Sequence, residues 1–210
     1  MTAQRLHRRS LMVLLALASL AGSPVNAAPT LGQPAPAFRV ADATGRTRTL
    51  TEFHGRTVVL EWTNNGCPYV GKHYGSGQMQ ALQRQATQDG VIWLTVVSSA
   101  PGFEGYMTGS QARAWKVKVG AASSDVLLDP EGVVGRAYDA RATPHMFIVD
   151  RTGRLVYMGG IDDRPTSDPE SLQGAHNYVA AALADLKAGR PVTEPVTRPY
   201  GCAVKYGSAD

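Results

Sequence analysis

The sequence has little cysteine, with only Cys67 and Cys202 among its 210 residues. Two cysteines are too few for a multi-disulfide scaffold or a cysteine-rich zinc module. The chain also lacks an apolar stretch of the roughly 18 to 20 residues that cross a membrane as a helix. With 43% hydrophobic and 18% charged residues, it is too apolar for a disordered protein. These features predict a globular protein of one domain, or at most two small ones.

The N-terminal segment, residues 1–27, has the pattern of an export signal. Three arginines precede a short apolar run, Leu11 to Leu20, and Val25-Asn26-Ala27 has the small-residue spacing of a cleavage site. A run of about ten residues is too short to span a bilayer, so a cleaved signal is favoured over a membrane anchor. We therefore expect a periplasmic or secreted protein without stable membrane insertion, in a compartment where disulfides persist.

The charge balance does not favour nucleic acid as a partner. The whole chain has 21 Lys and Arg residues against 17 Asp and Glu residues. Cleavage of the signal would remove three of the arginines and no acidic residue, which leaves the mature chain one positive charge in excess. A surface so close to neutral lacks the basic footprint of a nucleic-acid-binding protein.

Beyond the signal, apolar β-branched runs alternate with stretches of helical spacing. The expected strands are residues 38–40, 47–50, 57–62, 91–97, 145–149 and 154–158. The expected helices are 68–88, with a break at Gly75-Ser76-Gly77 and a restart capped by Ser76, then Ser110 through Trp115, and 170–187. This alternation predicts an α/β fold in which helices flank a central mixed sheet, with the first two strands forming an N-terminal hairpin.

One domain is expected over residues 28–189, followed by an extended tail over residues 190–210. Gly189 ends the last expected helix, and the tail is rich in proline, which disfavours further helix. This tail carries the second cysteine, Cys202.

Cys67 lies directly after an apolar strand and directly before a helix. Pro68 suits the first helical turn because it has no N–H group to leave unpaired. The sulfur of Cys67 should face free backbone N–H groups and the positive end of the helix dipole, which both favour the reactive thiolate. We expect this sulfur to be held as an anion and to be open to solvent. A buried, inert cysteine is the alternative.

The size of the required pKa shift shows that the helix end is not enough. From a reference pKa near 8.5, lowering by about two units would make the thiol roughly three-quarters ionised at pH 7 and needs about 2.7 kcal/mol. A helix end typically supplies about 0.3 to 1 kcal/mol. A nearby donor or cation must supply the rest, and Lys72 and His73 are the candidates. Glu61, an acid inside a strand, is a candidate proton acceptor behind the site, or else raises the pKa.

Several motifs occur in a characteristic order: Gly32-Gln33-Pro34-Ala35-Pro36-Ala37-Phe38, Gly55 to Trp62, Cys67-Pro68, Asp129-Pro130-Glu131-Gly132, Thr143-Pro144 and Phe147 to Gly153. Over about residues 29–187 the chain resembles the redoxin superfamily, the alkyl hydroperoxide reductase/thiol-specific antioxidant group of thioredoxin-fold proteins. It is most similar to the exported, peroxiredoxin-like branch. The resemblance implies a thioredoxin-like fold of four or five strands flanked by helices. It also implies that Thr143-Pro144 is a cis-proline turn facing Cys67.

The chain departs from the family pattern at the cysteine. Asn64-Asn65-Gly66-Cys67 has one cysteine, at the second of the two positions of a thioredoxin C-x-x-C site. A peroxidase site has Thr or Ser three residues before its cysteine, where this chain has Asn64. Peroxiredoxins also place an arginine about where Pro144 falls, and Arg141 is close but displaced. The resemblance implies a hybrid site in which Asn64 and Pro68 stabilise the thiolate or position the substrate.

Cys202 is the one thiol within the chain that can complete a reaction begun at Cys67. Attack on a peroxide leaves a sulfenic acid and attack on a disulfide leaves a mixed disulfide, and each needs a second thiol. Two alternatives stay open. In the first, Cys67 and Cys202 form a permanent structural disulfide, which would add about 4 to 5 kcal/mol to the stability of the fold by the chain-entropy relation. In the second, Cys202 pairs with another chain.

Other groups give weaker indications. No cofactor is expected, and a copper or zinc site built from Cys67, His73 and His145 is disfavoured because the ligands are few. Asp162-Asp163-Arg164 follows the last expected strand, and a solvated loop is favoured there over a role in lining the site.

The sequence therefore predicts an exported thiol-dependent oxidoreductase with peroxiredoxin-like antioxidant activity. Cys67 is its redox-active thiolate, Cys202 its possible resolving cysteine, and Thr143 and Pro144 complete the catalytic site. The expected partners are a peroxide or protein disulfide substrate and an external, thioredoxin-like thiol reductant. The alternatives are a general thiol-disulfide oxidoreductase without peroxidase activity, or a non-enzymatic binding protein with a structural Cys67–Cys202 disulfide.

Overall fold

A computed structural model describes residues 28–208, so the predicted export signal at 1–27 lies outside the described residues. Within this range a seven-stranded sheet has the order β2-β1-β5-β4-β3-β7-β8, and β6 pairs separately with β9. The strands are β1 (Arg39–Asp42), β2 (Thr47–Thr49), β3 (Val58–Trp62), β4 (Ile92–Val97), β5 (Asp125–Leu128), β6 (Ala142–Thr143), β7 (His145–Val149), β8 (Leu155–Gly159) and β9 (Cys202–Ala203).

The sheet is mixed, as the sequence predicts. Strand β3 is parallel to β4 and antiparallel to β7, and β4 is parallel to β5. Every residue of β3 is buried, which fits the continuous apolar run of a strand covered on both faces. The N-terminal hairpin of β1 and β2 is present, and it joins the sheet because β1 pairs antiparallel with β5. This addition makes the sheet larger than the four or five strands that the resemblance implies.

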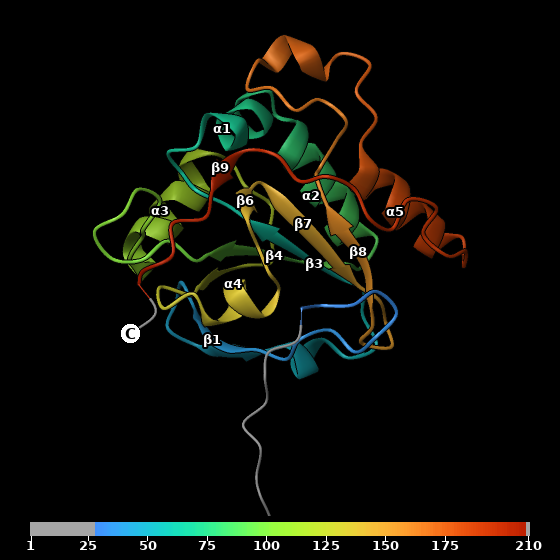
Figure 1. Cartoon of the computed structure of the whole chain (residues 1–210), viewed down its shortest axis with the longest axis horizontal. Coiled ribbons are helices and arrows are strands. Elements are labelled where there is room, and N and C mark those ends of the chain that lie inside the picture. The colour runs from blue at the N-terminus through green and yellow to red at the C-terminus, as the bar shows by residue number, and fades with distance from the viewer. Residues whose placement is uncertain (1–27, 209–210) are drawn as a thin grey trace, which may run out of the picture.

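Helices cover both faces of the sheet (Figure 1). The helices are α1 (Pro68–Gly75), α2 (Gln78–Gln88), α3 (Gly109–Lys118), α4 (Val133–Ala137) and α5 (Tyr178–Lys187), with 3-10 turns η1 (Leu50–Phe53) and η2 (Pro169–Leu172). Apolar residues of α1, α2 and α5 pack with Val59 of β3, whereas Val134 of α4 packs with Val58, Leu60 and Trp62. The alternation of side chains along a strand therefore divides the core into two layers.

Several element boundaries differ from the sequence predictions. The expected helix 170–187 is a 3-10 turn and a separate helix α5, because Gly174 has a left-handed φ of +70° and Asn177 caps α5. The break between α1 and α2 is confirmed, but Ser76 ends α1 and Gly77 precedes α2. Helix α3 is capped by Thr108, not by Ser110. Strand β5 and helix α4 were not anticipated, since both are short and lack a full period.

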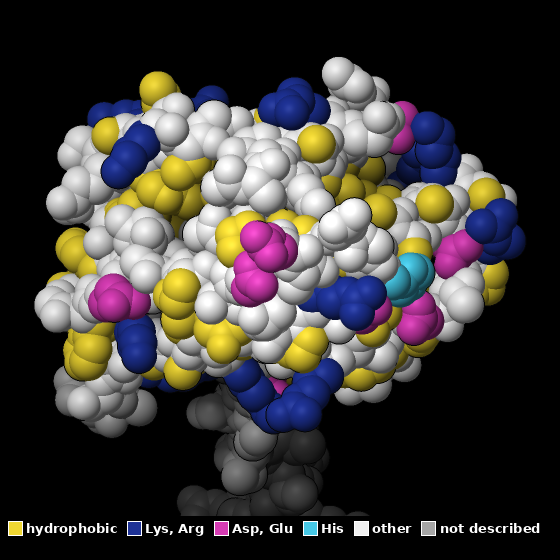
Figure 2. All heavy atoms as spheres, turned by 90° about the horizontal axis from the view of Figure 1, so that it is seen from above, with side chains coloured by type: hydrophobic (Ala, Val, Ile, Leu, Met, Phe, Trp, Pro, Cys, Tyr) yellow, Lys and Arg dark blue, Asp and Glu magenta, His cyan; other side chains and the backbone are white. Residues whose placement is uncertain are grey.

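The tail after α5 is extended and crosses the end of the sheet beside α1 (Figure 1). Val196 bridges to Met158 of β8, β9 pairs antiparallel with β6, and the carbonyl of Lys205 accepts a hydrogen bond from Ala100 N. Among residues 28–208, no helix has the length and apolar character needed to cross a bilayer. On the face seen in Figure 2, Lys and Arg side chains are interspersed with Asp and Glu.

Candidate active site

Cys67 is the N-cap residue of α1, and Pro68 begins the helix. The chain leaves β3 at Trp62 and reaches this position through a short turn, in which Cys67 N donates to the carbonyl of Asn64 at 3.1 Å. The cysteine thus lies where free N–H groups of a helix converge, as the sequence predicts. The expected setting at a strand-to-helix junction is confirmed by this geometry.

The Thr143-Pro144 peptide bond is cis and faces Cys67, as the resemblance implies. The Cys67 thiol donates to the carbonyl oxygen of Thr143, with Sγ and O 3.2 Å apart. Thr143 in β6 is paired with Cys202 in β9, and the Thr143 hydroxyl donates to the Cys202 carbonyl at 3.3 Å. A residue 135 positions away in the sequence is thereby brought to the active cysteine.

Both cysteines have free thiols, and Thr143 links them, because its carbonyl oxygen accepts from Cys67 Sγ and its backbone is paired with Cys202. Burial by itself raises the pKa of the Cys67 thiol, but hydrogen bonds from Cys202, from Thr143 and from Val70 N outweigh burial, and the pKa is lowered. The pKa of Cys202 is raised to about 12 by burial, by hydrogen bonding with Cys67 and by the negative charge of the Cys67 thiolate. The arrangement favours a thiolate at Cys67 and a thiol at Cys202.

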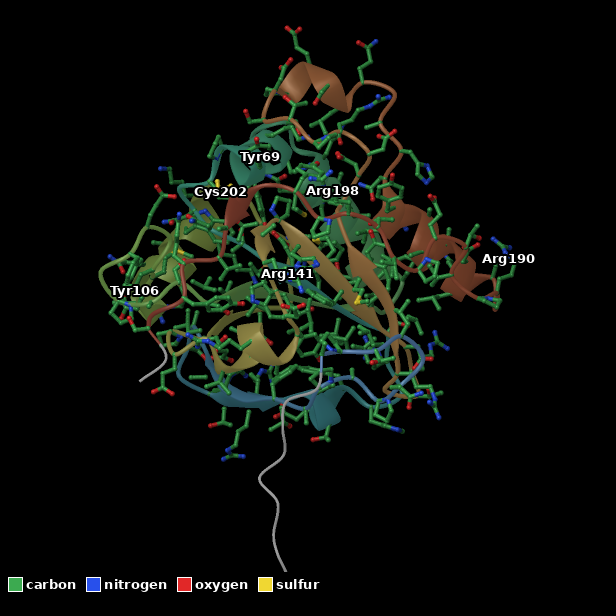
Figure 3. The ribbon with its side chains drawn as sticks, in the orientation of Figure 1. Tyr69, Tyr106, Arg141, Arg190, Arg198 and Cys202 are labelled. Carbon is green, nitrogen blue, oxygen red and sulfur yellow. The ribbon has the colours of Figure 1, made fainter. Side chains whose placement is uncertain are left out.

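The expectation that the sulfur of Cys67 is open to solvent is wrong. Cys67 is only 2% exposed and lies in the apolar layer formed with α1, α2 and α5, whereas Cys202 is half-buried. The tail lies against this end of α1, since Tyr200 meets the ring of Tyr69 edge to face and β9 pairs with β6 (Figure 3). The sulfur nevertheless keeps amide and thiol donors, so this burial differs from that of an inert cysteine in a hydrocarbon core.

Lys72 and His73 do not turn toward the sulfur, although both are on α1. Lys72 Nζ donates to the hydroxyl of Tyr200 at 3.1 Å, and His73 Nε2 is 3.1 Å from the same oxygen. The hydroxyl of Tyr200 donates to Asp162 at 2.5 Å. The groups that lower the pKa of Cys67 are instead those of Cys202, Thr143 and Val70.

These four residues form a buried polar cluster, which we call the Tyr200 cluster: Lys72, His73, Asp162 and Tyr200. Lys72 and His73 are each 1% exposed and Asp162 is 3% exposed. Burial lowers the pKa of His73 to about 4, so its ring is neutral near pH 7. The interpretation of Asp162 as part of a solvated loop is wrong, and Tyr200 was not recognised as a site residue. Its only sequence signal is its place two residues before Cys202.

Asn64 is buried and organises the turn before Cys67. Its Oδ1 accepts from Gly66 N at 2.8 Å, and its Nδ2 donates to a carboxylate oxygen of Glu104 at 3.2 Å. The side chain of Asn64 thus fixes the turn through the backbone. Arg141 is exposed and donates to Asp139 at 3.0 Å, and in Figure 3 it lies apart from Cys202.

Glu61 lies in a second buried polar cluster, which we call the Glu61 cluster: Glu61, Tyr74, Gln83 and Trp93. The carboxylate accepts from Trp93 Nε1 at 2.7 Å, Tyr74 OH at 2.8 Å and Gln83 Nε2 at 3.0 Å. Burial raises the pKa of Glu61 to about 7 despite these bonds. Because Tyr74 belongs to α1, the cluster fastens the helix that begins at Cys67 to the sheet.

Three contacts fasten the tail on either side of Cys202. Gly201 has a φ of +128°, and a Cβ there would overlap the carbonyl oxygen of Thr143. Upstream, the hydroxyl of Thr197 accepts from Gly160 N at 3.0 Å. Downstream, Tyr206 OH donates to the carbonyl of Ala140 at 2.7 Å. The close approach at Gly201 requires the absence of a side chain.

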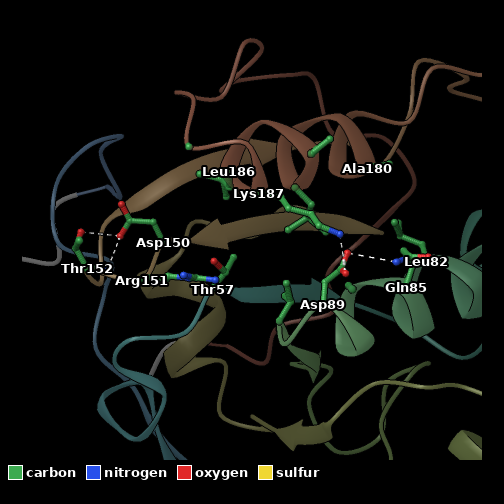
Figure 4. A pocket seen from close by; sticks show the side chains of 15 residues that line it. Thr57, Leu82, Gln85, Asp89, Asp150, Arg151, Thr152, Ala180, Leu186 and Lys187 are labelled. Atoms are coloured by element: carbon green, nitrogen blue, oxygen red, sulfur yellow. Dashed lines mark hydrogen bonds and ion pairs between the residues drawn. The ribbon is translucent and has the colours of Figure 1, made fainter.

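A large cavity, about 660 Å³ in volume, lies away from the cysteines. It is bounded by α2 and α5 and by Thr57 and Asp150, at the beginning of β3 and the end of β7 (Figure 4). Cys67 follows the opposite end of β3. A salt bridge between Lys187 and Asp89, 2.8 Å long, crosses this cavity. The cavity is therefore separate from the candidate active site.

The residues weighed for a metal site do not converge. His73 faces Tyr200, whereas His145 Nδ1 accepts from Arg141 N at 3.2 Å. Burial lowers the pKa of His145 to about 4. Residues 28–208 contain no group of three or more His, Cys, Asp or Glu side chains placed to hold a metal ion.

Comparison with known proteins agrees with this architecture. The chain is 26% identical over 166 residues to the thiol-disulfide oxidoreductase ResA of Geobacillus thermodenitrificans, covering 72% of this chain and 85% of ResA. A hypothetical protein of Sinorhizobium meliloti has a similar crystal structure, with a TM-score of 0.75 and 26% identity, and the likeness covers 87% of this chain and 98% of the other. The crystal structure of an uncharacterized conserved protein of Geobacillus kaustophilus is also similar, with a TM-score of 0.73 and 25% identity. That likeness covers 86% of this chain and 94% of the other.

These likenesses bear out the thioredoxin-like fold expected from the sequence. In this chain the fold has a mixed central sheet, flanking helices and a cis-proline turn opposite a cysteine. The family model described as Redoxin matches residues 30–175, which is more than half of the chain. The chain therefore belongs to the redoxin family.

Proposed function

We propose that this protein is a thiol-disulfide oxidoreductase that alternates between a Cys67/Cys202 dithiol and an intramolecular Cys67–Cys202 disulfide. The observation that carries the proposal is that Thr143 meets both cysteines, accepting from Cys67 Sγ at 3.2 Å and pairing in β6 with Cys202 of β9, while Cys202 packs on the apolar layer that contains Cys67. The likeness to a thiol-disulfide oxidoreductase supports the same class of reaction. The substrate is a disulfide, and a thiol reductant outside the chain restores the dithiol.

The first step is attack by the Cys67 thiolate on one sulfur of the substrate disulfide. A mixed disulfide forms between Cys67 and that sulfur, while the other substrate sulfur leaves as a thiolate. The lowered pKa of Cys67 increases the fraction of its attacking thiolate form. The carbonyl of Thr143 accepts from the neutral thiol, so this contact by itself favours the protonated form of Cys67.

The second step is attack by Cys202 on the sulfur of Cys67, which releases the second substrate thiol and leaves the Cys67–Cys202 disulfide. Two causes of the raised pKa of Cys202 are its bond to Cys67 and the negative charge there. Both disappear once Cys67 is in a mixed disulfide. Cys202 thus becomes easier to ionise at the stage at which it must react. The substrate thiolate released in the first step accepts its proton.

Substrate access requires the tail to leave the cis-proline turn. Cys67 is 2% exposed, and the edge of β6 is occupied by β9. Two residue pairs hold β9, at Ala142 with Ala203 and at Thr143 with Cys202. So short a ladder is stabilised mainly by its flanking side-chain contacts, which makes it a segment that can separate.

The geometry supports disulfide exchange better than peroxide reduction. The arginine that a peroxidase needs beside its cysteine is not supplied by Arg141, which is exposed and paired with Asp139. Asn64, which stands in the position of a peroxidase Thr or Ser, is engaged by Gly66 and Glu104. Peroxiredoxin-like antioxidant activity is the alternative that the same thiolate would serve, through a sulfenic acid resolved by Cys202.

We also propose that the mature protein begins near Ala28 and works outside the cytoplasm, as an exported protein. The arginine-rich start, short apolar run and small-residue site of residues 1–27 support this location. An oxidising compartment suits an enzyme whose oxidised form is a disulfide.

Rapid mixing of the reduced protein with oxidised glutathione, quenched by acid and an alkylating reagent, tests the exchange activity. We expect exchange faster than with free cysteine, and peptide mapping that shows a Cys67–Cys202 bond as the product. The variant Cys202→Ser should instead accumulate glutathione on Cys67. Exchange no faster than with free cysteine, or a Cys67–Cys202 bond that dithiothreitol cannot reduce, would overturn the proposal. A parallel experiment with hydrogen peroxide decides the peroxidase alternative.

A further inference from the structure

The tail is held to α1 by a buried polar contact that lies one residue from the site of bond formation. Tyr200 and Cys202 are separated only by Gly201, and Lys72 and His73 are five and six residues after Cys67. The Tyr200 cluster and the pair of cysteines therefore connect the same two segments, α1 and the tail. A contact that fixes Tyr200 against α1 therefore restricts where Cys202 can lie relative to Cys67.

The hydroxyl of Tyr200 has a full set of hydrogen bonds. It donates its proton to Asp162 and accepts from Lys72, and the remaining lone pair faces His73 Nε2. Because the His73 ring is neutral, this contact requires the tautomer with the proton on Nε2. Three side chains that are almost completely buried thus depend on one oxygen from the tail.

The ring of Tyr200 makes packing contacts in addition to the hydrogen bonds of its hydroxyl. It lies 5.0 Å from Lys72 Nζ and meets the ring of Tyr69 edge to face at 5.9 Å. Lys72 also donates to the carbonyl of Arg164 at 2.7 Å, so it keeps a partner of its own. Lys72, His73 and Asp162 thus form a socket on α1 and the segment after β8, in which the tail places the side chain of Tyr200.

The geometry points to Tyr200 as the positioning residue of the resolving step, which holds the Cys202 sulfur against Cys67 by inserting its hydroxyl among Lys72, His73 and Asp162. This inference rests on the proposed function, since it concerns how the intramolecular disulfide forms. The hydrogen bonds of the Tyr200 hydroxyl go to Lys72, His73 and Asp162, so it acts on the sulfurs through the backbone of Gly201 and Cys202. Removing the hydroxyl leaves buried charges with one partner fewer, which weakens the insertion of the tail.

The test measures the equilibrium between the protein dithiol and glutathione. Oxidised glutathione and the dithiol give the Cys67–Cys202 disulfide and two reduced glutathione molecules, so the equilibrium constant reports how well the two sulfurs are held together. Tyr200→Phe keeps the ring and removes the hydroxyl. We expect the constant to fall about tenfold or more, because hydrogen bonds to charged groups are lost.

Tyr206→Phe is the matched control, because it removes the hydroxyl of the other tail tyrosine. Tyr206 lies downstream of Cys202, and its hydroxyl donates one hydrogen bond, to the carbonyl of Ala140. We expect the constant to change less than about threefold. We also expect the pKa of Cys67, followed by thiolate absorbance, to rise in Tyr200→Phe and to stay unchanged in Tyr206→Phe, since only the former loosens the Cys202 donor.

Each outcome is decisive for one of the two proposals. If the unsubstituted protein forms no Cys67–Cys202 disulfide, the proposed function fails. If it does form the bond and Tyr200→Phe lies within threefold of it, or Tyr206→Phe falls equally far, the role of Tyr200 is overturned. Should Tyr200→Phe not fold, Asp162→Asn replaces it, because it removes the charge that accepts the hydroxyl proton and should lower the constant in the same direction.

Discussion

Both cysteines meet Thr143, yet the regions that hold them differ in kind. Cys67 is fixed by regular structure, since it follows a fully buried strand and caps a helix that packs on the sheet. Cys202 belongs to a two-residue strand and is held by the side chains of its neighbours, above all Tyr200. One sulfur is part of the scaffold and the other is brought to it by a detachable segment.

This difference divides the chemistry between the regions. The scaffold lowers the pKa of Cys67 with donors that include a helix N–H group, whereas the tail supplies a thiol whose pKa is raised. The tail also covers the sulfur that it helps to ionise. A cycle of exchange therefore requires a rigid nucleophile and a resolving thiol that can withdraw and return.

The largest effect should come from the scaffold side, with Cys67→Ser. A hydroxyl at this position cannot attack a disulfide, so we expect exchange with oxidised glutathione to fall by about three orders of magnitude or more. Stopped-flow measurement of glutathione release is the assay. Residual exchange comparable to that of the unsubstituted protein would show that Cys202 is itself the nucleophile.

Substitution on the tail side, Cys202→Ser, should stop turnover but not the first step. We expect one glutathione per chain to remain bound to Cys67, because no second thiol can displace it. Intact mass and peptide mapping of the acid-quenched reaction identify the adduct. Continued turnover without accumulation of the adduct would contradict the assignment of Cys202 as the resolving thiol.

Glu61→Gln sharpens the comparison by probing the scaffold alone. The folded-state pKa of Glu61 is about 7 against an ordinary value of 4.5. The unfolded chain therefore loses this proton first, and stability falls as pH rises between these two values, by about 3 kcal/mol in all. Glutamine cannot titrate, so that loss should be absent in the variant.

Urea unfolding of both proteins across pH 4.5 to 7.5 measures the effect as the difference between their free energies of unfolding. His73 and His145, whose pKa values are lowered, contribute a slope of the opposite sign, which is common to both proteins and cancels in the difference. A difference that does not change with pH would mean that Glu61 is ionised throughout.

A smaller effect is expected for Gly201→Ala, which acts on the tail alone. The added Cβ would overlap the carbonyl of Thr143 at a φ that L-residues rarely adopt. We expect the equilibrium constant for the Cys67–Cys202 disulfide to fall about tenfold, with thermal stability of the core unchanged. Gly189→Ala is the control, since Gly189 also has a positive φ but no atom lies near its Cβ.

The sequence predicts the scaffold well because scaffold signals are local. The apolar run before Cys67, the proline after it and the periodic positions of α1 and α2 together place the cysteine at a helix N-terminus. The cis-proline turn at Thr143-Pro144 follows from the family resemblance and is present. Short elements such as β5 and α4 escape this reasoning, since four or five residues do not complete a period.

The tail could not be placed from the sequence because its contacts are long-range. Tyr200 meets Lys72 and His73 across more than 120 positions, and nothing in the spacing of these residues indicates that they share one oxygen. For the same reason Lys72 and His73 were assigned to the thiolate on proximity along α1 alone. Helical spacing shows which side chains share a face of α1, but it does not show which distant residue packs against that face.

The most direct test of the account is a redox titration of the unsubstituted mature protein in glutathione buffers, with the cysteines identified by alkylation and peptide mapping. The account predicts one reversible two-electron transition in which Cys67 and Cys202 become linked to each other within one chain. Cysteines that stay separate across the whole range, or that join two chains instead, would contradict it.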